Sequence, residues 1–504
     1  MFAKILIANR GEIAVRIARA CKEMGITPVA IYSDVDRTAL HVSHAYEAHH
    51  VGGSESRASY LNIERVVATA RACGADAVHP GYGFLAENAA FAQACQDAGL
   101  VFIGPSPAAI RSMGNKLEAR EKMKKAGVPI VPGSDGPVRD PREAARVARS
   151  IGYPVLLKAA AGGGGKGMRV VRKAEEFTSA LALTTGEAEA AFGDASVYIE
   201  KFIENPKHIE IQVMADSHGH IVTYGERECS MQRRYQKVIE EAPSPVVTPA
   251  MRAALSEAAR KAAAAAGYCG AGTVEFIVDA ERRFYFLEMN TRLQVEHPVT
   301  EMIYGVDLVK QQIEIAAGER LAIRQEDVVP RGHAIEMRIY AEDPAHGFMP
   351  SIGRINRLVL PQGPGVRNEN GVYEGYEIPI YYDPMLGKMV VWADSREEAI
   401  RRAHRALREY RCEPVRTNVD FLLWALAEPA FLDGSYHTKT IEQDFAPARL
   451  HQRDEEVELA AIAATIAAFN YRATVRYRTT EGEAAGANAW RRAARADGTR
   501  RWTR

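Results

Sequence analysis

Two glutamates in the segment GTVEFIVDAERRFYFLEMN could hold a divalent cation. A two-residue turn at residues 281–282 would place Glu275 directly opposite Glu288 on the neighbouring strand, with Asn290 on the same face. At a cross-strand separation of ~5 Å and an effective dielectric constant of ~20, two carboxylates repel by roughly 3 kcal/mol. A divalent cation removes that cost, and oxygen ligands of this kind suit Mg²⁺. The alternative is two glutamates on a solvated surface.

A run of glycines, KAAAGGGGKGM at residues 158–168, lies between two apolar stretches. A P-loop is excluded because Gly167 and a strand follow Lys166, where that motif needs Ser or Thr and the start of a helix. A match to G-x-G-x-x-G carries little weight, since a run of four glycines produces it readily. Strands on both sides indicate a glycine hairpin that closes over phosphates as a mobile lid, with Lys158 and Lys166 adding positive charge. The alternative is a hairpin that is merely flexible.

Two further segments concentrate polar and ionisable side chains. NTRLQVEHP, residues 290–298, follows the glutamate hairpin with little apolar periodicity, and such groups beside a metal indicate reaction chemistry. ERECSMQRRYQK, residues 226–237, is interpreted as a charged loop that follows a strand and holds anions. For a charge run of this kind, the other interpretation is a solvated surface.

The elements that must position these residues divide the 504-residue chain into several blocks, because one core of this size would be too large. Residues 1–113 alternate short apolar strands with amphipathic helices, which predicts an α/β domain with a parallel, Rossmann-like sheet. Residues 114–330 contain paired alternating strands, HIEIQVMAD with HIVTYGER and GTVEFIVD with RFYFLEMN, typical of an α+β domain with antiparallel hairpins. Residues 331–445 mix strands and turns with the helix REEAIRRAHRALREY, and residues 446–504 form a tail.

Charge, cysteine content and hydropathy argue against several classes of protein. Lysine plus arginine and aspartate plus glutamate each number 64, so the overall charge gives no sign of a nucleic-acid-binding protein. The six cysteines are scattered without close pairs, which is typical of reduced thiols, and neither a signal peptide nor a membrane span is expected. The first turn reads NRGE at residues 9–12 instead of G-x-G-x-x-G, which argues against a dehydrogenase. We therefore expect a cytoplasmic protein that meets any anion locally.

Several long strings together resemble the biotin carboxylase family, the ATP-grasp component of biotin-dependent carboxylases. The strings are HPGYGFLAENAAFA, AAAGGGGKGMRVV, EIQVMAD, ECSMQRRYQKVIEEAPSP, EMNTRLQVEHPVTE, RGHAIEMRIYAEDP and YYDPMLGKMVV. The likeness spans about residues 1–445. It implies a pre-ATP-grasp domain at 1–113, an ATP-grasp domain at 114–330 with a mobile glycine-rich lid around 131–203, and a C-terminal biotin carboxylase domain at 331–445. The glycine run would then close over the phosphates of ATP.

The resemblance also implies roles for individual side chains. For ATP it implies binding by Lys116, Lys158, Gly163, Gly164, Gly165, Lys166, Glu200, Lys201, Ile203, His208 and Gln232. For Mg²⁺ or Mn²⁺ it implies Glu275, Glu288 and Asn290, in agreement with the hairpin count. For bicarbonate it implies Lys237, Arg292, Gln294 and Val295. The implied catalytic residues are Glu296 as general base, Arg338 as the group that stabilises the enolate of biotin, and Lys237 and Arg292.

The reaction that the resemblance implies is the ATP- and bicarbonate-dependent carboxylation of biotin through carboxyphosphate, with ATP, Mg²⁺ and biotin as cofactors. Bicarbonate is a poor nucleophile until it loses a proton, and flanking cations hold the dianion against the γ-phosphate. Because no Met-Lys-Met string occurs, we expect biotin to arrive on a separate biotin carboxyl carrier protein, with the carboxyltransferase on another subunit. The resemblance suggests a homodimer within a larger acetyl-CoA, other acyl-CoA or pyruvate carboxylase.

Two features depart from the family pattern or lie beyond it. The family usually has histidine before the Gln-Lys pair of the anion segment, where this chain has Tyr235, which donates a hydrogen bond but carries no positive charge near neutral pH. The tail contains four apolar residues at the spacing typical of one face of a helix: Leu459, Ile462, Ile466 and Phe469. The string YRATVRYR then alternates like a strand. Partner docking and a helix packed on its own domain with a solvated end both explain this tail.

Two other functions stay open from the sequence. One is another ATP-grasp carboxylate ligase, against which the segment RLQVEH and Arg338 argue. The other is a catalytically silent nucleotide-binding subunit of an assembly, against which the intact Lys237, Glu296 and Arg338 argue.

Overall fold

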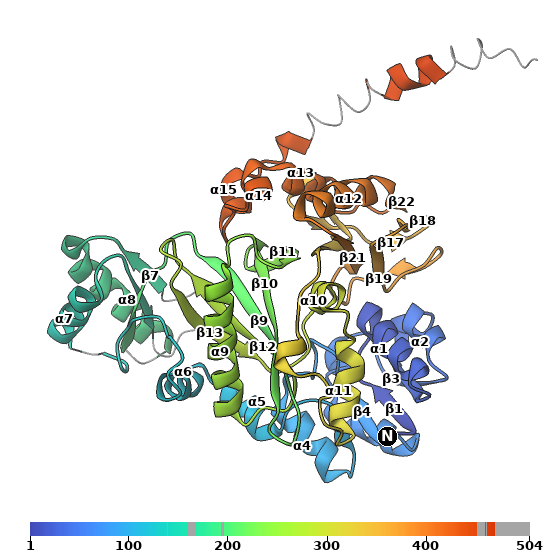
Figure 1. Ribbon diagram of the computed structural model, residues 1–504, viewed down its shortest axis with the longest axis horizontal. Helices are drawn as coiled ribbons and strands as arrows, with labels where there is room; N and C mark the ends of the chain where they lie inside the picture. Colours follow the sequence, from blue (N-terminus) through green and yellow to red (C-terminus); the bar gives the residue numbers. More distant parts are fainter. Residues whose placement is uncertain (139, 160–167, 193–195, 451–458, 460, 469–504) are drawn as a thin grey trace, which may run out of the picture. The chain divides into compact units, whose positions relative to one another are not determined.

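The computed structural model (Figure 1) describes residues 1–138, 140–159, 168–192, 196–450, 459 and 461–468. By its contacts the chain divides into two units, Met1–Pro447 and Ala448–Arg504, and every predicted site residue belongs to the first. Across the described ranges, no helix combines the length and the apolar character that crossing a lipid bilayer requires.

The N-terminal block folds as a parallel sheet with the strand order β3-β2-β1-β4-β5. Its strands are β1 Lys4–Ile7, β2 Thr27–Ser33, β3 Glu47–Gly52, β4 Ala77–His79 and β5 Val101–Phe102. Its helices are α1 Gly11–Glu23, α2 Leu40–His44, α3 Ile63–Ala72, α4 Ala89–Asp97 and α5 Pro107–Gly114. Ile5 and Ile7 pack into one apolar core and Leu6 into another, because alternate strand residues point to opposite faces. The predicted α/β domain is confirmed.

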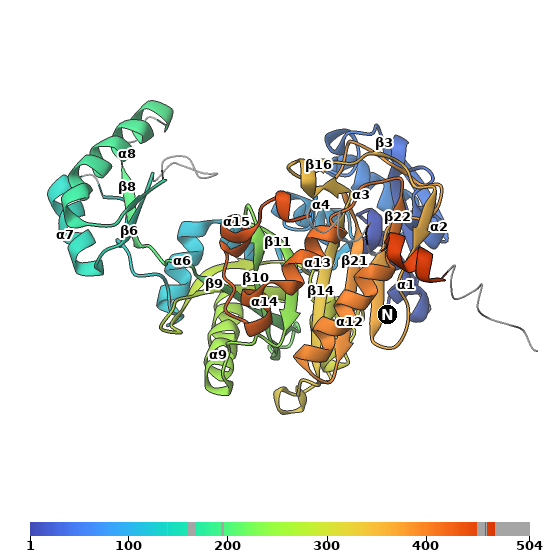
Figure 2. The same ribbon diagram turned by 90° about the horizontal axis from the view of Figure 1, so that it is seen from above.

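After α6 (Lys116–Lys125) the chain forms a small module with its own apolar core. Its antiparallel sheet has the order β7-β6-β8, built from β6 Val155–Ala159, β7 Met168–Val171 and β8 Val197–Lys201. Helices α7 (Pro141–Ile151) and α8 (Phe177–Phe192) cover this sheet (Figure 2). The strands on either side of the glycine run are therefore antiparallel neighbours, as predicted, with Lys158 opposite Met168. The run itself, with Gly163, Gly164, Gly165 and Lys166, lies outside the described residues.

The largest sheet has eight strands and runs from the second predicted block into the third. Its order is β13-β12-β9-β10-β11-β14-β21-β19, with antiparallel neighbours throughout. The strands are β9 Lys207–Ala215, β10 Ile221–Arg233, β11 Gln236–Ala242, β12 Gly270–Val278, β13 Phe284–Asn290, β14 His333–Tyr340, β19 Val366–Asn370 and β21 Met385–Ala393. Hydrogen bonds between β11 and β14 carry the sheet across residue 330, the predicted border between two domains.

One part of this sheet is apolar on one face and polar on the other, although both faces are buried. On β9, Ile209 and Ile211 pack under α9 (Pro249–Ala266), which lies along the sheet in Figure 1. The residues of β9 that alternate with them and point to the opposite face are His208, Glu210 and Gln212. A buried polar face needs partners for every charge, so this face is where a site is to be sought.

Sequence signals at both ends set the bounds of α9. The Thr248 side chain accepts the backbone N–H of Met251, and Pro249 occupies the first turn. Gly267 ends the helix in the left-handed conformation at φ 57°, which glycine adopts without a steric penalty. The next helices are α10 His297–Tyr304 and α11 Leu308–Ala316.

Short strand pairs and further helices complete the first unit. The pairs are β15 Glu342–Asp343 with β16 Met349–Pro350, β17 Gly353–Arg354 with β20 Glu377–Ile378, and β18 Arg357–Val359 with β22 Arg411–Glu413. The helices are α12 Arg396–Glu409, which is the predicted one, α13 Val419–Ala427, α14 Pro429–Asp433 and α15 Thr440–Asp444. Single 3₁₀ turns occur at Asp34–Asp36, Ser56–Ala58, Ala174–Glu176, Gln325–Asp327 and Pro344–His346.

In the second unit, residues 459 and 461–468 are helical, and Leu459, Ile462 and Ile466 are exposed. Phe469 and the string YRATVRYR lie outside the described residues. All six cysteines of the chain are free thiols, as the sequence predicts.

Candidate active site

The segment at residues 226–237 is a β-hairpin with a buried first strand and an exposed tip, so its interpretation as a charged loop was wrong. β10 runs to Arg233 and β11 begins at Gln236, with Arg234 and Tyr235 as a two-residue turn. Both turn residues have positive φ, 49° and 65°, as a type I′ turn requires. The charges of β10 tolerate burial because they find partners across the sheet, and the sequence of the segment alone does not reveal those partners.

Arg227 shows how this polar face is satisfied. Its side chain is fully buried, and its guanidinium uses all five N–H donors. The acceptors are Glu210, Gln212, Thr273, Gln294 and Thr300. Arg227 therefore joins β9, β10, β12, α10 and the loop before α10 into one rigid block.

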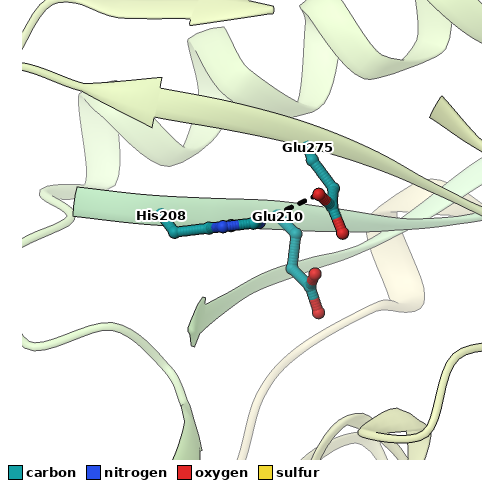
Figure 3. A group of neighbouring side chains, drawn as sticks. All are labelled: His208, Glu210 and Glu275. Carbon is teal, nitrogen blue, oxygen red and sulfur yellow. Dashed lines mark ion pairs between the residues drawn. The ribbon is translucent and has the colours of Figure 1, made fainter. Parts of the chain in front are cut away.

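Lys237 lies at the centre of a cluster of carboxylates on the same face. Its Nζ is 2.6 Å from Glu210 Oε2, 3.0 Å from Glu275 Oε1 and 2.5 Å from Glu296 Oε1. Burial lowers the pKa of Lys237, but the three carboxylates outweigh it and raise the pKa well above its usual value. Figure 3 shows Glu210 extending from β9 and Glu275 from the adjacent β12, where Glu275 Oε2 also pairs with His208 Nε2 at 3.1 Å.

Glu296 joins Lys237 to Arg338. Its second oxygen, Oε2, accepts from Arg338 Nη2 at 2.9 Å, while Arg338 Nε donates to Glu240 at 2.6 Å. Glu296 is the N-cap residue of α10, but its side chain makes no capping bond and faces the two cations instead. Burial raises the pKa of Glu296, but Lys237 and Arg338 more than offset this, so the net pKa lies well below the usual value. We name these residues the lysine cluster: Lys237, Glu210, Glu275, Glu296 and Arg338.

Glu275 and Glu288 are cross-strand partners, as the sequence predicts, but the hairpin reaches this register by another route. The turn was expected to have two residues, whereas Asp279 and Arg283 close a three-residue turn with Arg282 at φ 62°. A β-bulge between Glu275 and its neighbour Phe276 then restores the predicted pairing. The two differences cancel because each shifts the register by one residue.

The glutamate pair and Asn290 fit a divalent cation. Burial, followed by the charge of the nearby Glu275, raises the pKa of Glu288, and a bound cation would favour the ionised carboxylate again. Within the described ranges, the Glu288 carboxylate makes no hydrogen bond or ion pair, and Asn290 Nδ2 is buried without an acceptor. Carboxylate and amide oxygens are the ligands that Mg²⁺ prefers. Glu275 would contribute only by exchanging part of its bonding to Lys237.

A cavity of about 360 Å³, which we name the first cavity, brings several predicted residues together. Predicted residues among its lining are Lys116, Lys158, Glu200, Glu288 and Asn290. Lys158 Nζ pairs with Glu200 Oε2 at 2.5 Å across β6 and β8. The cavity thus lies between the small module and the glutamate hairpin, and it carries two lysines beside a carboxylate that is open to a ligand.

A second cavity of about 470 Å³ opens beside the lysine cluster. Arg292, Val295 and Arg338 line it together with Tyr82 and Gln236. It therefore combines two guanidinium groups with aromatic surface, which suits a ligand that is partly apolar and partly anionic.

The loop between β13 and α10 separates the two cavities and is held from several directions. Arg292 Nε donates to Glu87 Oε2 at 2.8 Å, and its Nη2 donates to Asn290 Oδ1 at 3.1 Å. Lys388 Nζ donates to the Val295 carbonyl at 2.6 Å. The amide of Gln294 donates to Glu275 at 2.8 Å and accepts from Arg227, so this side chain points into the polar face of the sheet.

Other predicted nucleotide-binding residues do not line the first cavity. Lys201 donates to the carbonyls of Gly152 and Tyr153 at 2.9 and 2.8 Å, within the small module. Gln232 contacts His208 at 2.9 Å, on the polar face beside Glu275. Burial lowers the pKa of His208, but Glu275 outweighs it, so the net pKa is raised. Ile203 is half-buried and absent from the cavity lining.

Sequence reasoning assigned no role to several residues that build the site. They are Glu87, Arg120, Glu210, Arg227 and Glu240. Glu87 and Glu210 lie inside two of the strings that carry the family resemblance, HPGYGFLAEN and EIQVMAD, which was the available signal. Arg120 lines the first cavity from α6, where a sequence rich in lysine and arginine hides it.

An antiparallel sheet with paired carboxylates, a small three-stranded module and lysines around a shared cavity are the features of an ATP-dependent ligase of the ATP-grasp class. Family models match three consecutive ranges: the N-terminal domain of biotin carboxylase at residues 1–110, the ATP-binding domain of the carbamoyl-phosphate synthase L chain at 115–324, and the biotin carboxylase C-terminal domain at 336–443.

Curated relatives and solved structures agree with these matches. A biotin carboxylase of Nostoc sp. is 55% identical over 442 residues, covering 88% of this chain and 99% of that protein. The 2-oxoglutarate carboxylase small subunit of Hydrogenobacter thermophilus is 50% identical over 475 residues, covering 93% of this chain and 100% of that protein. A solved biotin carboxylase domain dimer of the 2-oxoglutarate carboxylase from the same organism, in complex with MgADP and bicarbonate, has a TM-score of 0.80 at 51% identity, covering 88% and 99%. The chain belongs to the biotin carboxylase family.

Proposed function

We propose that this chain carboxylates biotin on a separate carrier protein, using ATP and bicarbonate, with the first cavity for nucleotide and the second for bicarbonate and biotin. The observation that supports this division most directly is the position of Glu296. Its carboxylate lies between Lys237 and Arg338, on the loop that separates the two cavities. A proton removed there would be removed beside Lys237 and beside Arg338, which lines the second cavity.

The first step that the geometry supports is deprotonation of bicarbonate. Glu296 is ionised near neutral pH because its pKa lies well below the usual value: the charges of Lys237 and Arg338 outweigh the effect of burial. Bicarbonate that enters beside Lys237 would share the ammonium group with Glu296 and so weaken its effect on the carboxylate. The pKa of Glu296 would then rise at the point where this carboxylate must accept a proton. Arg292, held by Glu87, would fix the other side of the anion.

Nucleotide would be held by Lys116 and Lys158, with Glu275, Glu288 and Asn290 as ligands of Mg²⁺. The cation, when bound with ATP, neutralises charge on the phosphates. Lys158 would then exchange Glu200 for a phosphate oxygen, because a phosphate carries more charge than one carboxylate. Glu200, Lys201 and Ile203, with His208 nearby, would border the adenine and ribose, and Gln232 would also bind ATP.

Arg338 would stabilise the enolate of biotin in the second cavity. A guanidinium stays cationic at every physiological pH and offers directed donors, which suits a developing oxyanion. Burial opposes the charge of Arg338, but Glu240 and Glu296 outweigh it and raise its pKa still further above the usual value.

The assembly is proposed from the relatives. A pyruvate carboxylase of Methanothermobacter thermautotrophicus and the 2-oxoglutarate carboxylase described above each have a subunit that matches this chain. We therefore expect a biotin carboxyl carrier protein and a carboxyltransferase on other subunits here. A homodimer is proposed, as in the solved domain dimer named above. We place the protein in the cytoplasm, where its free thiols would stay reduced.

The test is ATP hydrolysis measured with and without bicarbonate and free biotin. Turnover should require bicarbonate and rise when biotin is added. The variant Arg338→Gln should lose the increase with biotin, whereas Arg357→Gln, an exposed arginine on β18, should keep it. Equal hydrolysis with and without bicarbonate would overturn the proposal. Copurifying and identifying the biotinylated partner would show which carboxylase the chain serves, and so which molecule finally receives the carboxyl group.

A further inference from the structure

Two glutamates beside Arg338 are buried more deeply than the arginine that they face. Glu240 on β11 and Glu336 on β14 are register partners, and both are 0% exposed. Glu336 and Arg338 are two residues apart on one strand, so all three side chains point to the same face of the sheet. Helix α10 covers this face, as Val299 packs against Ala242 and Ala334 of the same strand pair.

Hydrogen bonding leaves this pair incomplete. Glu240 Oε1 accepts from Arg338, but Glu240 Oε2 and both oxygens of Glu336 are buried without a hydrogen-bond partner in the part of the chain that the structure describes. An ionised carboxylate in such a place loses its hydration and gains nothing in return. One proton held between the two neighbouring carboxyl groups gives a bond to two of these three oxygens, one on each glutamate, and removes the repulsion between the two charges.

The surrounding charges do not neutralise both glutamates. The charged groups that act on the pair are Arg338 on β14, Lys388 on β21, Lys237 on β11 and Glu296 before α10. Two titratable groups that are neutral near pH 7, the Cys229 thiol on β10 and the Tyr340 hydroxyl on β14, also interact with Glu240. Lys388 is already bound to the Val295 carbonyl and lies 3.3 Å from Glu12. Burial, which the cations only partly offset, raises the pKa of Glu240 to about 7 and that of Glu336 well above its usual value.

We propose that Glu240 and Glu336 share one proton near neutral pH, and that this singly charged pair positions Arg338 for the biotin enolate. If both glutamates were ionised, their second charge would compete with the enolate for the guanidinium. With a single charge, Glu240 orients Arg338 while part of its electrostatic attraction stays available to the substrate. This inference rests on the enolate-stabilising role of Arg338 in the proposed function.

The pH dependence of biotin-stimulated turnover tests the shared proton. Raising the pH removes the proton and adds a negative charge beside Arg338, so turnover of the unaltered enzyme should fall on the alkaline side. In Glu336→Gln the amide donates permanently, and this alkaline fall should disappear or move to higher pH. Glu377→Gln, an exposed glutamate on β20, should keep the profile of the unaltered enzyme. Superimposable profiles for the unaltered enzyme and Glu336→Gln would overturn the inference.

Two further measurements keep the inference falsifiable if Glu336→Gln folds poorly. Infrared difference spectra of the unaltered enzyme between neutral and alkaline pH should contain the carbonyl band of a neutral carboxylic acid, and its absence would overturn the shared proton. The variant Glu240→Gln should lower biotin-stimulated turnover roughly tenfold, the loss expected for one charge-assisted hydrogen bond, while the KM for ATP stays close to that of the unaltered enzyme. ATP hydrolysis measured in parallel with bicarbonate but without biotin shows which of the two proposals has failed. If bicarbonate dependence is missing in the unaltered enzyme, the proposed function fails; if it is present and the pH profiles agree, only this inference fails.

Discussion

The lysine cluster and the first cavity hold their charges in opposite ways. In the lysine cluster, Lys237 contacts three carboxylates, and both oxygens of Glu296 accept from cationic side chains of the protein. In the first cavity, Glu288 has no partner among the described residues, and its pKa is raised, whereas that of Glu296 lies well below the usual value.

This difference separates a site that is organised in advance from one that its ligand completes. Groups that stabilise a developing charge act best when they need no rearrangement at the moment of reaction. A site for a metal and nucleotide can instead leave its carboxylates unpaired, because the arriving cation supplies the missing charge. Substitutions in the two regions should therefore have different kinetic effects.

The largest effect is expected for Glu296→Gln, an isosteric change inside the lysine cluster. Removing a general base lowers turnover by about 100-fold or more. The KM for ATP should change little, because Glu296 does not line the first cavity. ATP hydrolysis with bicarbonate and biotin measures both constants, with Glu319→Gln, an exposed glutamate after α11, as the control. A loss of less than tenfold would show that this part of the cluster is not essential.

Glu241 is a buried carboxylate to which we assign a structural role, in contrast to Glu296. It is fully buried on the same strand as Glu240, and its partners are side chains outside the lysine cluster. Its oxygens contact His333 at 2.5 Å, Arg396 at 2.7 Å and Tyr436 at 2.6 Å. Burial would raise its pKa, but His333 and Arg396 outweigh this and lower the pKa from 4.5 to about 2. Breaking a buried pair of this kind, as in Glu241→Gln, should lower the free energy of unfolding by about 3 kcal/mol at neutral pH.

The sign of the pH dependence follows from the lowered pKa of Glu241. A folded-state value below the unfolded one stabilises the fold fully above pH 4.5, and that stability is lost as the pH falls toward 2. The difference in thermal midpoint between the unaltered protein and Glu241→Gln should therefore shrink over this range. A constant difference down to pH 3 would contradict the assignment.

A smaller effect should distinguish the two glutamates of the hairpin. Glu288→Gln should raise the concentration of Mg²⁺ and ATP needed for the half-maximal rate by roughly tenfold, because changes in a metal site weaken metal affinity by about this factor. The maximal rate should change little. Glu275→Gln should raise this concentration and also lower the maximal rate, because Glu275 contacts Lys237. Identical kinetic constants for the two variants would contradict the functional difference between the lysine cluster and the first cavity.

The smallest effect is expected for Tyr235→His, which restores the residue usual in the family. The Tyr235 side chain is 93% exposed at the tip of the β10–β11 hairpin. Interactions at such exposed positions are worth up to about 1 kcal/mol, so kcat/KM should change by less than about fivefold. A larger gain would show that this hairpin tip contacts a substrate during turnover.

The sequence was sufficient where local patterns decide the structure. Alternation along HIEIQVMAD predicted the strand that became β9, and the resemblance named Lys237, Glu296 and Arg338, which the structure brings together through the two oxygens of Glu296. The pairing of Glu275 with Glu288 was also predicted, although the turn and the bulge that produce it were not. A bulge depends on packing across strands, which one segment of sequence does not contain.

The sequence was insufficient where charges are buried by distant partners. Arg227 and Glu228 were interpreted as parts of a charged loop that holds anions, because the acceptors that bury Arg227 come from four other segments of the chain. The strand β3, EAHHVG, does not fit the apolar strands expected for this block, since polar residues occupy half of its positions and its pairing with β2 fixes it. Glu87 and Glu210 hold catalytic groups in place. Both lie in strings that carry the family resemblance, but only their contacts in the structure show what they do.

The eight-stranded sheet limits where the chain can be divided into fragments. A fragment that stops at residue 330 keeps Glu296 and Lys237, but it loses β14 and with it Arg338. Such a fragment also leaves the backbone N–H and C=O groups of β11 open along one side, the kind of edge at which chains aggregate. Attempts to exchange the carboxyl-terminal end between relatives should therefore place the junction after β22, where the backbone pairing of this sheet and of the β18–β22 pair is complete.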